Sequence, residues 1–428
     1  MSKFKRYERY KDSGVEWLGE IPEHWEVKKI KYLANVINVK ASDSDNNKTY
    51  IGLENIESKT GKLLVDDIDE QQVIEGTSNV FEKNDVLFSK LRPYLAKCLI
   101  ADFSGRCTSE LLVLRCKGIL PKYMFFFMLS PKFIDVVNSS TYGTKMPRAN
   151  WDFIGNLKIP LPSQEEQKSI IEYLSKKCNE IDALIEDKEK LIELLQEKRQ
   201  TIITEAVTKG LNPNARMKDS GIEWIGEIPE HWNLRRIRYL ANIRNVKASD
   251  SDIDKTYVGL ENIESKTGKL LTNGDDEQQF VGETANIFKK GDVLFGKLRP
   301  YLAKCIIADF DGRCTSELLV LKTTSYILPK YLHFFMLSPK FIDVVNSSTY
   351  GAKMPRASWD FIGNLEIPLP SIKEQEDIVE YLTEFISRID DLISDINTQI
   401  QKLKEYRQSL ISEAVTGKID VRDYVVSN

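Results

Sequence analysis

The sequence predicts an α+β protein in which two copies of one domain are joined by two long antiparallel coiled-coil helices. Three observations lead to this fold class: an internal repeat along the 428 residues, short strand-like runs broken by Gly and Pro, and a long charged helix after each copy. With 42% apolar and 10% aromatic residues, the chain can bury a sizeable core, so a disordered protein is excluded.

The internal repeat has a period of about 207 residues. Residues 11–17 recur as 218–224, and residues 145–148 recur as 353–356. Solenoid repeats are only about 20–50 residues long, so this period indicates a duplicated domain with a pseudo-two-fold axis. All six tryptophans fall into matched pairs, which are Trp17 and Trp224, Trp25 and Trp232, and Trp151 and Trp359.

Each copy mixes strand and helix signals. In the first copy, residues 85–89 and 110–114 are short apolar runs typical of strands. Residues 121–129 predict a buried helix that starts on a proline. Pro160 and Pro162 then exclude a helix or a central strand. The pattern predicts a compact α+β domain of about 140 residues in each copy.

A long helix follows the prolines of each copy. Ser163 and Glu166 form a capping-box signature at its start, and apolar residues then recur in steps of three and four. The seam is interrupted by Lys188 and by Arg199 and Arg407, which are equivalent in the two copies. The predicted seam residues are Ile171, Leu174, Cys178, Ile181, Ile185, Ile192, Leu195, Ile202 and Ala206, then Val379, Leu382, Ile386, Ile389, Ile393, Ile396, Ile400, Leu403, Leu410 and Ala414.

Two arrangements could explain these helices. Each could lie on the core of its own domain, but a stripe two residues wide per heptad is narrow for that, so a coiled coil is favoured. The duplication predicts that the two helices pair antiparallel. The predicted organisation is an N-terminal segment 1–24, a first domain 25–162, a first helix 163–209, a linker 210–231, a second domain 232–370, a second helix 371–416 and a C-terminal tail 417–428.

Motifs that carry catalysis are missing from the sequence. It contains neither a phosphate-binding loop nor a dinucleotide fingerprint, and Cys98, Cys107 and Cys116 lack the spacing of a zinc site. Six cysteines are too few for a disulfide framework, and neither a signal peptide nor a membrane span is predicted. We therefore expect a non-enzymatic cytoplasmic protein without a metal or a cofactor of its own.

The charge is unevenly distributed. The formal net charge is −4, but residues 163–209 and 371–418 together carry −7, which leaves the rest of the chain with +3. Each domain has two loop segments that combine basic residues with hydroxyl and aromatic side chains. The candidate DNA-binding residues are Lys90, Arg92, Tyr94, Lys97, Thr141, Tyr142, Lys145 and Arg148, with their second-copy matches Lys297, Arg299, Tyr301, Lys304, Thr349, Tyr350, Lys353 and Arg356.

These loops allow two interpretations. Arg and Lys bind phosphates, and Arg, Asn and Thr also read base edges in a DNA groove. Alternatively the residues form an ordinary solvated surface, and Arg92 and Arg148, each beside a proline, could hold the fold. From spacing alone, both interpretations stay open.

Motifs that occur once in each copy resemble those of type I restriction–modification specificity subunits. The resemblance covers essentially the whole chain. In the first copy it rests on Ile51–Ile56, Lys90–Leu95, Lys145–Arg148, Ile159–Ser163 and the pair Glu166 and Gln167.

The resemblance implies a protein that recognises DNA and leaves catalysis to its partners. Each copy would be a target recognition domain that reads one half of a bipartite site in double-stranded DNA, and the helices would act as a ruler. Two modification subunits would methylate adenine with S-adenosylmethionine, and a restriction subunit would use ATP and Mg²⁺ to translocate and cleave DNA.

In proteins of this family the two recognition domains commonly differ. This sequence departs from that pattern because the candidate DNA-binding loops of its two copies are nearly identical. Identical readers related by a two-fold axis meet the same bases on opposite strands, so we predict a near-palindromic target. Differences between the copies could relax one half-site; they are Thr144 and Ala352, Ser89 and Gly296, and Asn150 and Ser358. The alternatives are a duplicated coiled-coil adaptor that binds only proteins, and an enzyme with an unrecognised site in the α+β domain.

Overall fold

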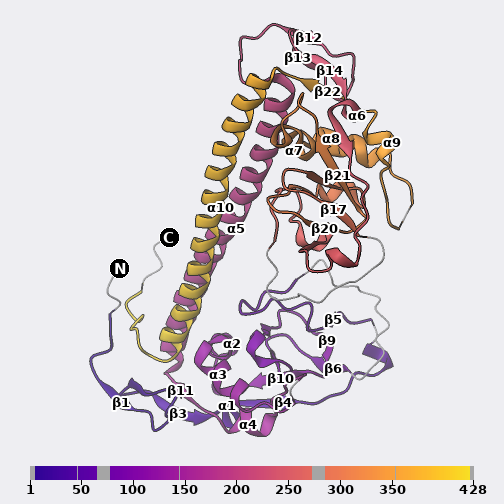
Figure 1. Cartoon of the computed structure of the whole chain (residues 1–428). Coiled ribbons are helices and arrows are strands. Elements are labelled where there is room, and N and C mark those ends of the chain that lie inside the picture. Colours follow the sequence, from indigo (N-terminus) through magenta and orange to yellow (C-terminus); the bar gives the residue numbers. More distant parts are fainter. Residues whose placement is uncertain are drawn as a thin grey trace. The chain divides into compact units, whose positions relative to one another are not determined.

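The computed structural model describes residues 5–45, 47–64, 78–143, 145–271, 285–351 and 353–424. The chain forms two compact units: unit 1 contains residues 1–188 and 397–428, and unit 2 contains residues 189–396. Their boundaries fall inside the two long helices, α5 (Gln164–Lys209) and α10 (Ile372–Val415). Each unit therefore combines one copy of the α+β domain with part of both helices (Figure 1).

Unit 1 contains a four-stranded antiparallel sheet in the order β4-β10-β7-β8 and a mixed three-stranded sheet in the order β5-β9-β6. Two-stranded pairs β1-β2 and β11-β3 complete it. The strands are β1 (Tyr10–Asp12), β2 (Glu20–Pro22), β3 (Glu26–Lys29), β4 (Ala34–Ile37), β5 (Tyr50–Ile51), β6 (Ser78–Phe81), β7 (Val86–Ser89), β8 (Cys98–Ile100), β9 (Gly105–Thr108), β10 (Leu111–Cys116) and β11 (Lys158–Leu161). The short helices are α1 (Ile30–Leu33), η1 (Asp43–Asp45), η3 (Pro93–Leu95), α2 (Pro121–Leu129), α3 (Pro131–Ser139) and α4 (Trp151–Asn156).

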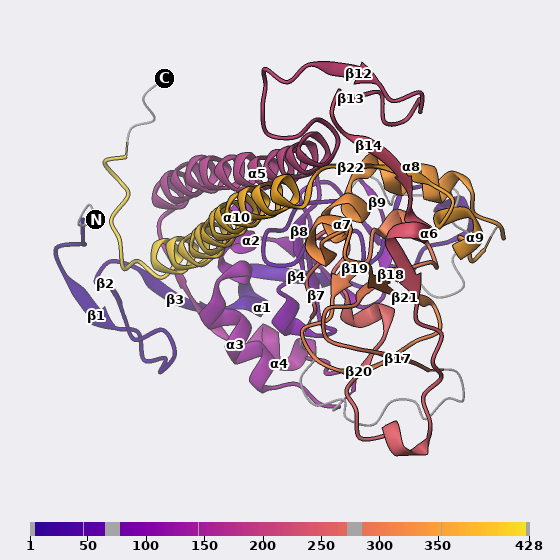
Figure 2. The same ribbon diagram turned by 45° about the horizontal axis from the view of Figure 1, so that its top comes forward.

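Unit 2 repeats this plan, with sheets β15-β21-β18-β19 and β16-β20-β17 and the pairs β12-β13 and β14-β22. Figure 2 shows β14 and β22 side by side. The strands are β12 (Met217–Asp219), β13 (Glu227–Pro229), β14 (Asn233–Arg236), β15 (Ala241–Ile243), β16 (Tyr257–Val258), β17 (Asn286–Phe288), β18 (Val293–Gly296), β19 (Cys305–Ile307), β20 (Gly312–Cys314), β21 (Leu318–Thr323) and β22 (Glu366–Leu369). The short helices are α6 (Ile237–Leu240), η4 (Asp250–Asp252), η5 (Leu260–Asn262), η6 (Pro300–Leu302), α7 (Pro329–Leu337), α8 (Pro339–Ser347) and α9 (Trp359–Ile362). The repeated topology confirms the predicted duplication and the α+β class.

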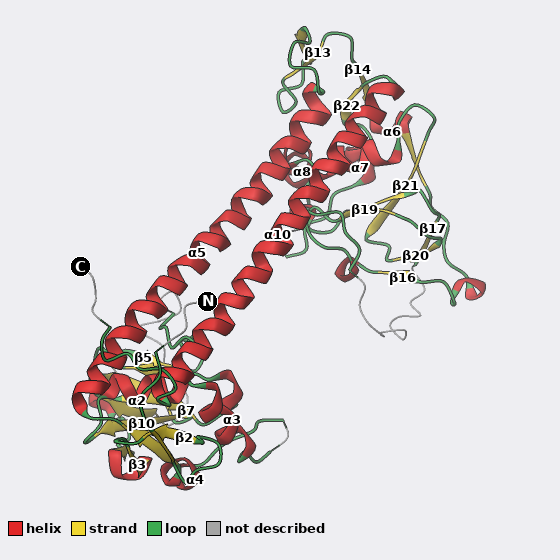
Figure 3. Cartoon of the chain, turned by 90° about the vertical axis from the view of Figure 1, so that its left-hand side faces the viewer, coloured by secondary structure: helices red, strands yellow, loops and turns green. Residues whose placement is uncertain are grey.

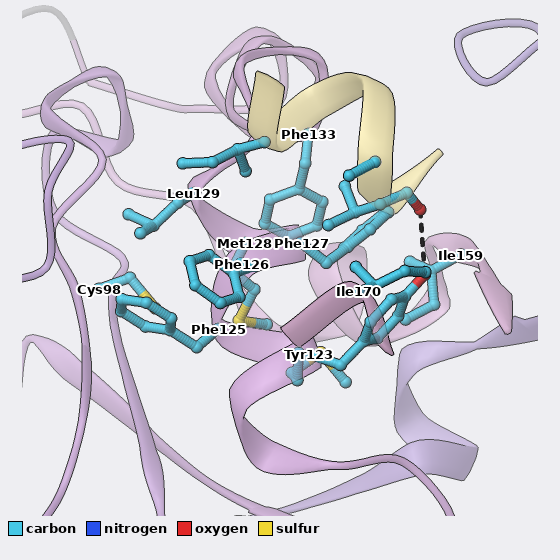
Figure 4. Packing of buried hydrophobic residues seen from close by; sticks show 14 of the residues in the cluster. Cys98, Tyr123, Phe125, Phe126, Phe127, Met128, Leu129, Phe133, Ile159 and Ile170 are labelled. Atoms are coloured by element: carbon cyan, nitrogen blue, oxygen red, sulfur yellow. Dashed lines mark hydrogen bonds between the residues drawn. The ribbon is translucent and has the colours of Figure 1, made fainter. Parts of the chain in front are cut away.

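Helix α2 is the centre of the unit 1 core. As predicted, it starts on Pro121, whose missing N–H costs nothing in the first helical turn, and all of its residues from Tyr123 to Leu129 are buried. The Tyr123 hydroxyl donates a 3.0 Å hydrogen bond to the Val415 carbonyl at the end of α10 (Figure 4). The core of unit 1 therefore contains residues of the long helices as well as of the domain.

The proline-rich segment after α4 forms an edge strand. Among the described strands, β11 pairs with β3 alone, so the missing N–H of Pro160 leaves no second neighbouring strand without a hydrogen-bond donor. The prediction that Pro160 and Pro162 exclude a helix or a central strand is therefore confirmed, and Pro162 lies between β11 and the start of α5.

The start of each long helix is tied to the domain by one glutamate. In unit 2 the Ser371 hydroxyl accepts from the Glu374 N–H, and the Glu374 carboxylate accepts from the Ser371 N–H, which completes a capping box. The same carboxylate binds His231 Nε2 at 2.7 Å and Trp232 Nε1 at 3.1 Å. In unit 1, Glu166 makes the equivalent contacts with His24 and Trp25 at 2.8 and 3.2 Å, and the Ser163 hydroxyl accepts from its N–H.

We expect Glu374 to make stability depend on pH. Burial alone would raise its pKa, but hydrogen bonds from His231, Trp232 and Ser371 outweigh burial and lower the pKa to about 2. A depressed pKa stabilises the fold above the unfolded-state value of about 4.5, and this contribution is lost as the pH falls toward 2. Denaturant unfolding should therefore show wild type and Glu374→Gln differing by a constant amount near neutral pH and converging between about pH 4.5 and 2. The control Glu376→Gln removes a nearby exposed charge; if its difference converges in the same way, the contacts of Glu374 are not the cause.

The two long helices run antiparallel in both units, as predicted (Figure 3). In unit 1, Asp182 contacts Arg407, and Lys188, further along α5, contacts Gln399, which is earlier in α10. In unit 2, α5 and α10 share one core. Its members include Ile203, Ala206 and Val207 from α5 with Ile378, Leu382 and Ile386 from α10.

Burial along the long helices departs from the predicted seam near the helix ends. At the ends the structure also buries Ile170, Ile203 and Ile378, each next to a predicted seam residue that is only half-buried. There the helices pack on the domain core and on each other, so the apolar face is wider than a two-residue stripe. Among the predicted seam residues, Leu174, Ile181, Leu382, Ile386 and Ile389 are buried, whereas Ile171, Ile185, Leu195, Ile393 and Leu403 are half-buried.

The chain ends belong to unit 1 and take part in its core. Leu18 and Ile21 from the N-terminal segment are buried there, as are Ile419 and Val421 from the C-terminal tail. After α10 the chain turns at Gly417, whose φ is +72°, and a Cβ at this position would lie 2.3 Å from Pro22. Only glycine fits this left-handed turn at such a close approach.

No helix in the described part of the chain is long and apolar enough to cross a membrane. All six cysteines are free; Cys116 is half-buried and the other five are buried. Burial raises the pKa of the Cys107 thiol to about 12, so the thiol stays protonated near neutral pH.

Candidate nucleic-acid interface

The two predicted basic segments of each copy lie next to each other. In unit 1 a β-bridge joins Leu91 to Arg148, and the Arg92 N–H donates to the Pro147 carbonyl at 2.8 Å. A second β-bridge, between Tyr142 and Arg148, joins the two ends of the second basic segment. Main-chain hydrogen bonds therefore build one loop pair, 90–97 with 141–148, from segments that are about 50 residues apart. In unit 2 the same bonds link Leu298 to Arg356, Arg299 to Pro355 and Tyr350 to Arg356.

The loop 90–97 contains a turn with a strained main chain. Arg92 and Ala96, on either side of η3, have φ values of +49° and +48°, in the left-handed region that non-glycine residues seldom adopt. Arg299 and Ala303 repeat this conformation around η6 with φ values of +49° and +46°. Strain of this kind persists where surrounding contacts fix it, and it is common at functional sites.

The exposed part of the loop pair is basic and aromatic. Arg92 and Lys145 are exposed, Tyr94 and Tyr142 are 46% and 61% exposed, and Lys90 is half-buried. Within the described residues, the side chains of Lys90, Arg92 and Lys145 have neither a hydrogen bond nor an ion pair. The second copy presents the same set, Lys297, Arg299, Tyr301, Tyr350 and Lys353. These ten residues, five in each copy, stay candidates for contact with DNA and are called the reading surfaces below.

The other predicted residues have partners inside the domain. The Lys97 ammonium donates to the Leu53 carbonyl at 2.5 Å, and burial lowers its pKa. The Thr141 hydroxyl donates to the Asn138 carbonyl at 2.8 Å. In the second copy Lys304 donates to Leu260 and Thr349 donates to Asn346 in the same way. These four side chains support the fold, and a contact with DNA stays a prediction for them.

Arg148 also has a structural role. Its guanidinium binds both carboxylate oxygens of Glu110 at 3.0–3.2 Å, and hydrogen bonding to Glu110 raises its pKa. Arg356 forms the same paired contact with Glu317 at 3.1–3.3 Å. Of the two interpretations of these arginines, the geometry favours the one in which they hold the loop.

Two of the three predicted differences between the copies lie within the described residues, one at the end of a strand and one at the start of a short helix. Ser89 is buried and its hydroxyl donates to the Leu91 carbonyl at 2.7 Å, while Gly296 occupies the same strand position in unit 2. Asn150 and Ser358 both cap a helix by accepting from a main-chain N–H, at 2.8 and 3.2 Å. Thr144 and Ala352 lie outside the described residues.

Sequence reasoning missed the buried link between the loop pair and the long helices. Arg199 and Arg407 appeared only as interruptions of the seam, yet both are buried and contact a turn of the α+β domain. The available signal was their equivalent position in both helices. The motif Ile51–Ile56 also has a structural role that the sequence pattern does not indicate. Its Asn55 side chain accepts from the Gly52 N–H at 2.7 Å and so shapes a turn. The Leu53 carbonyl of this turn accepts the hydrogen bond from Lys97.

Comparison with known proteins agrees with a duplicated DNA-reading architecture. Residues 22–194 and 229–402 each match the family model of the type I restriction modification DNA specificity domain. These matches span most of the chain, so the chain belongs to this family and contains two such domains.

Individual relatives are similar along most of their length. The type I restriction enzyme EcoDI specificity subunit of Escherichia coli is 23% identical over 75% of both chains. The putative type I restriction enzyme MjaX specificity subunit of Methanocaldococcus jannaschii is 25% identical over 98% of both chains.

Solved structures share the fold. A chain from a structural study of complex assembly and conformational transition in the type I R-M system matches with a TM-score of 0.70 at 18% identity, covering 92% of this chain and 98% of that one. The HsdS subunit of Thermoanaerobacter tengcongensis matches with a TM-score of 0.50 at 18% identity, covering 93% of this chain and 98% of that one.

Proposed function

We propose that this protein is the DNA specificity subunit of a type I restriction–modification complex and reads a bipartite, near-palindromic target. One observation carries this proposal: both copies present the same basic and aromatic side chains on the same pair of loops. Arg and Lys on such a surface suit phosphates and guanine edges, and the exposed tyrosines offer apolar contact to bases. Membership of the DNA specificity family supports DNA over a protein ligand.

The catalytic steps belong to other subunits in this proposal. Two modification subunits would bind S-adenosylmethionine and methylate adenine, and a restriction subunit would bind ATP and Mg²⁺, whereas this chain would bind no cofactor. The names of the relatives, which are specificity subunits of restriction enzymes, support this division of labour. We place the complex in the cytoplasm with the DNA.

Mapping methylated adenines in a genome that expresses the chain with modification subunits tests the target. We expect two inverted half-sites of near-identical sequence, separated by a nonspecific spacer. The isolated chain, incubated with DNA and S-adenosylmethionine, serves as the control and should transfer no methyl groups. Two unrelated half-sites would refute the symmetric target, and methylation by the isolated chain would show that it is an enzyme.

A further inference from the structure

Each long helix carries one buried arginine that contacts an aspartate of the other helix. Arg407 of α10 is 5% exposed, and its Nε lies 3.0 Å from Asp182 Oδ1 of α5 in unit 1. Arg199 of α5 is also 5% exposed, and its Nη1 donates to Asp390 Oδ1 of α10 at 3.1 Å in unit 2. The duplication has thus placed the same pair in both units, with the two helices exchanging roles.

The same arginines contact a turn of the α+β domain. Arg407 donates to the Lys59 carbonyl at 3.2 Å and to the Thr60 carbonyl at 3.4 Å, and Gln408 donates to the Lys59 carbonyl at 2.8 Å. Lys62 from this turn pairs with Asp182 at 3.1 Å. The turn is therefore held to both helices.

Unit 2 contains the equivalent set of contacts. Arg199 donates to the Thr267 carbonyl at 2.8 Å, and Gln200 donates to the Lys266 carbonyl at 3.1 Å. Lys269 pairs with Asp390 at 2.8 Å. The two groups of residues, Arg407, Asp182, Lys62 and Gln408 in unit 1 and Arg199, Asp390, Lys269 and Gln200 in unit 2, are called the arginine clamps below.

The clamped turn is hydrogen-bonded to the loop that carries part of the reading surface. The Lys59 N–H donates to the Ala96 carbonyl at 3.2 Å, and Ala96 ends the strained η3 turn that begins at Arg92. In unit 2 the Lys266 N–H donates to the Ala303 carbonyl at 3.3 Å. One residue therefore links each long helix, through its clamp, to the loop that presents an exposed arginine and tyrosine.

A buried arginine clamp is better suited to fixing the position of the turn on the helices than to stabilising the fold. Apolar residues in place of a buried ion pair often give equal or greater stability, so an arginine in an apolar seam needs another reason. The guanidinium has donors in a fixed planar array, so it fixes the direction of its hydrogen bonds to the carbonyls in both units and, for Arg199, to the aspartate. Leucine would fill the seam without fixing how the turn lies on the helices.

We propose that Arg407 and Arg199 are positioning residues that lock the reading surface of each copy to the helix pair, and so restrict the spacer that the protein accepts between half-sites. This inference rests on the proposed function. If the clamps loosen, each reading surface should still recognise its half-site, but it should tolerate a half-site that is shifted along the DNA.

The test uses the full chain assembled with its modification subunits. Adenine methylation is measured on DNA that carries both half-sites at the native spacer and at spacers one base pair shorter or longer. For Arg407→Leu and for Arg199→Leu, we expect unchanged half-site sequences and a roughly tenfold drop in the preference for the native spacer, the size of effect that one charge-assisted hydrogen bond can supply. Arg407→Lys should restore part of that preference. The control Arg388→Leu, at an exposed α10 position paired with Glu384, should leave the preference unchanged.

A second variant guards against loss of folding. Gln408→Ala combined with Gln200→Ala removes one hydrogen bond to each clamped turn without exposing or removing a buried charge, and it decides the question if Arg407→Leu loses methylation at every spacer. Full preference for the native spacer in this double variant, or altered half-site sequences in either arginine variant, would overturn the inference. If the wild-type complex itself shows no bipartite target, the proposed function fails instead.

Discussion

Seven residues inserted at the same level of both long helices should widen the spacer in the DNA target while leaving both half-sites unchanged. We place the insertions after Lys188 in α5 and after Ile396 in α10, where the compact units divide, so that each unit keeps its own contacts. Seven helical residues add about 10 Å, and DNA rises about 3.4 Å per base pair, so the spacer should grow by up to about 3 base pairs. Mapping of methylated adenines in cells that express the variant with its modification subunits measures both the spacer and the half-sites.

Single insertions are the natural controls for this prediction. A heptad added to α5 alone, or to α10 alone, puts the seam out of register and should reduce methylation at every target. The idea that the helices set the spacer is wrong if the double insertion keeps the original spacer, or if the bases of the half-sites change instead. A heptad preserves the apolar repeat, so a loss of folding is not the expected result.

The fold was largely predictable because its signals are local and occur twice. Pro121 at the first position of an apolar run predicted the start of α2, and Ser163 with Glu166 predicted the start of α5 to within one residue. Pro160, which lacks an N–H, excluded a helix or a central strand, and the structure has the edge strand β11 there. Each of these signals depends on the main chain and its nearest neighbours in sequence, so no knowledge of distant contacts was needed.

The site was predictable only as a pair of segments. Sequence spacing gathered the basic residues, but it could not show that Arg148 meets Glu110, which is 38 residues earlier, while Arg92 faces solvent. The same limit applies to the seam. Arg407 looked like a defect in the apolar repeat because its partners, Asp182 and the Lys59 carbonyl, are more than 200 residues away in the chain.

Neutralising one reading surface should weaken the binding of DNA by the free chain and flatten its dependence on salt. In the variant with Lys90, Arg92 and Lys145 all changed to alanine, three exposed or half-buried cations that have no partner within the described residues are lost from one copy. Each phosphate contact contributes about 0.9 to the slope of log K against log salt, so the slope should fall by up to about 2.7 and the affinity by roughly a hundredfold near 0.1 M salt. Fluorescence anisotropy with a labelled duplex over a salt series measures both quantities.

A control variant with the same change in net charge shows whether the loss of DNA affinity comes from the reading surface itself or from the net charge of the chain. Lys168, Lys190 and Lys198 are exposed on α5, and changing them to alanine lowers the formal charge of −4 by the same three units. This control should bind DNA with nearly the wild-type slope because the long-range field of distant exposed charges is screened within about 10 Å at such salt concentrations. The second-copy variant, with Lys297, Arg299 and Lys353 changed to alanine, should match the first-copy variant because the two surfaces present the same groups. An equal loss of affinity in the α5 control would show that only the net charge matters. If the wild-type chain shows no salt-dependent affinity for DNA, a protein-binding adaptor is favoured instead.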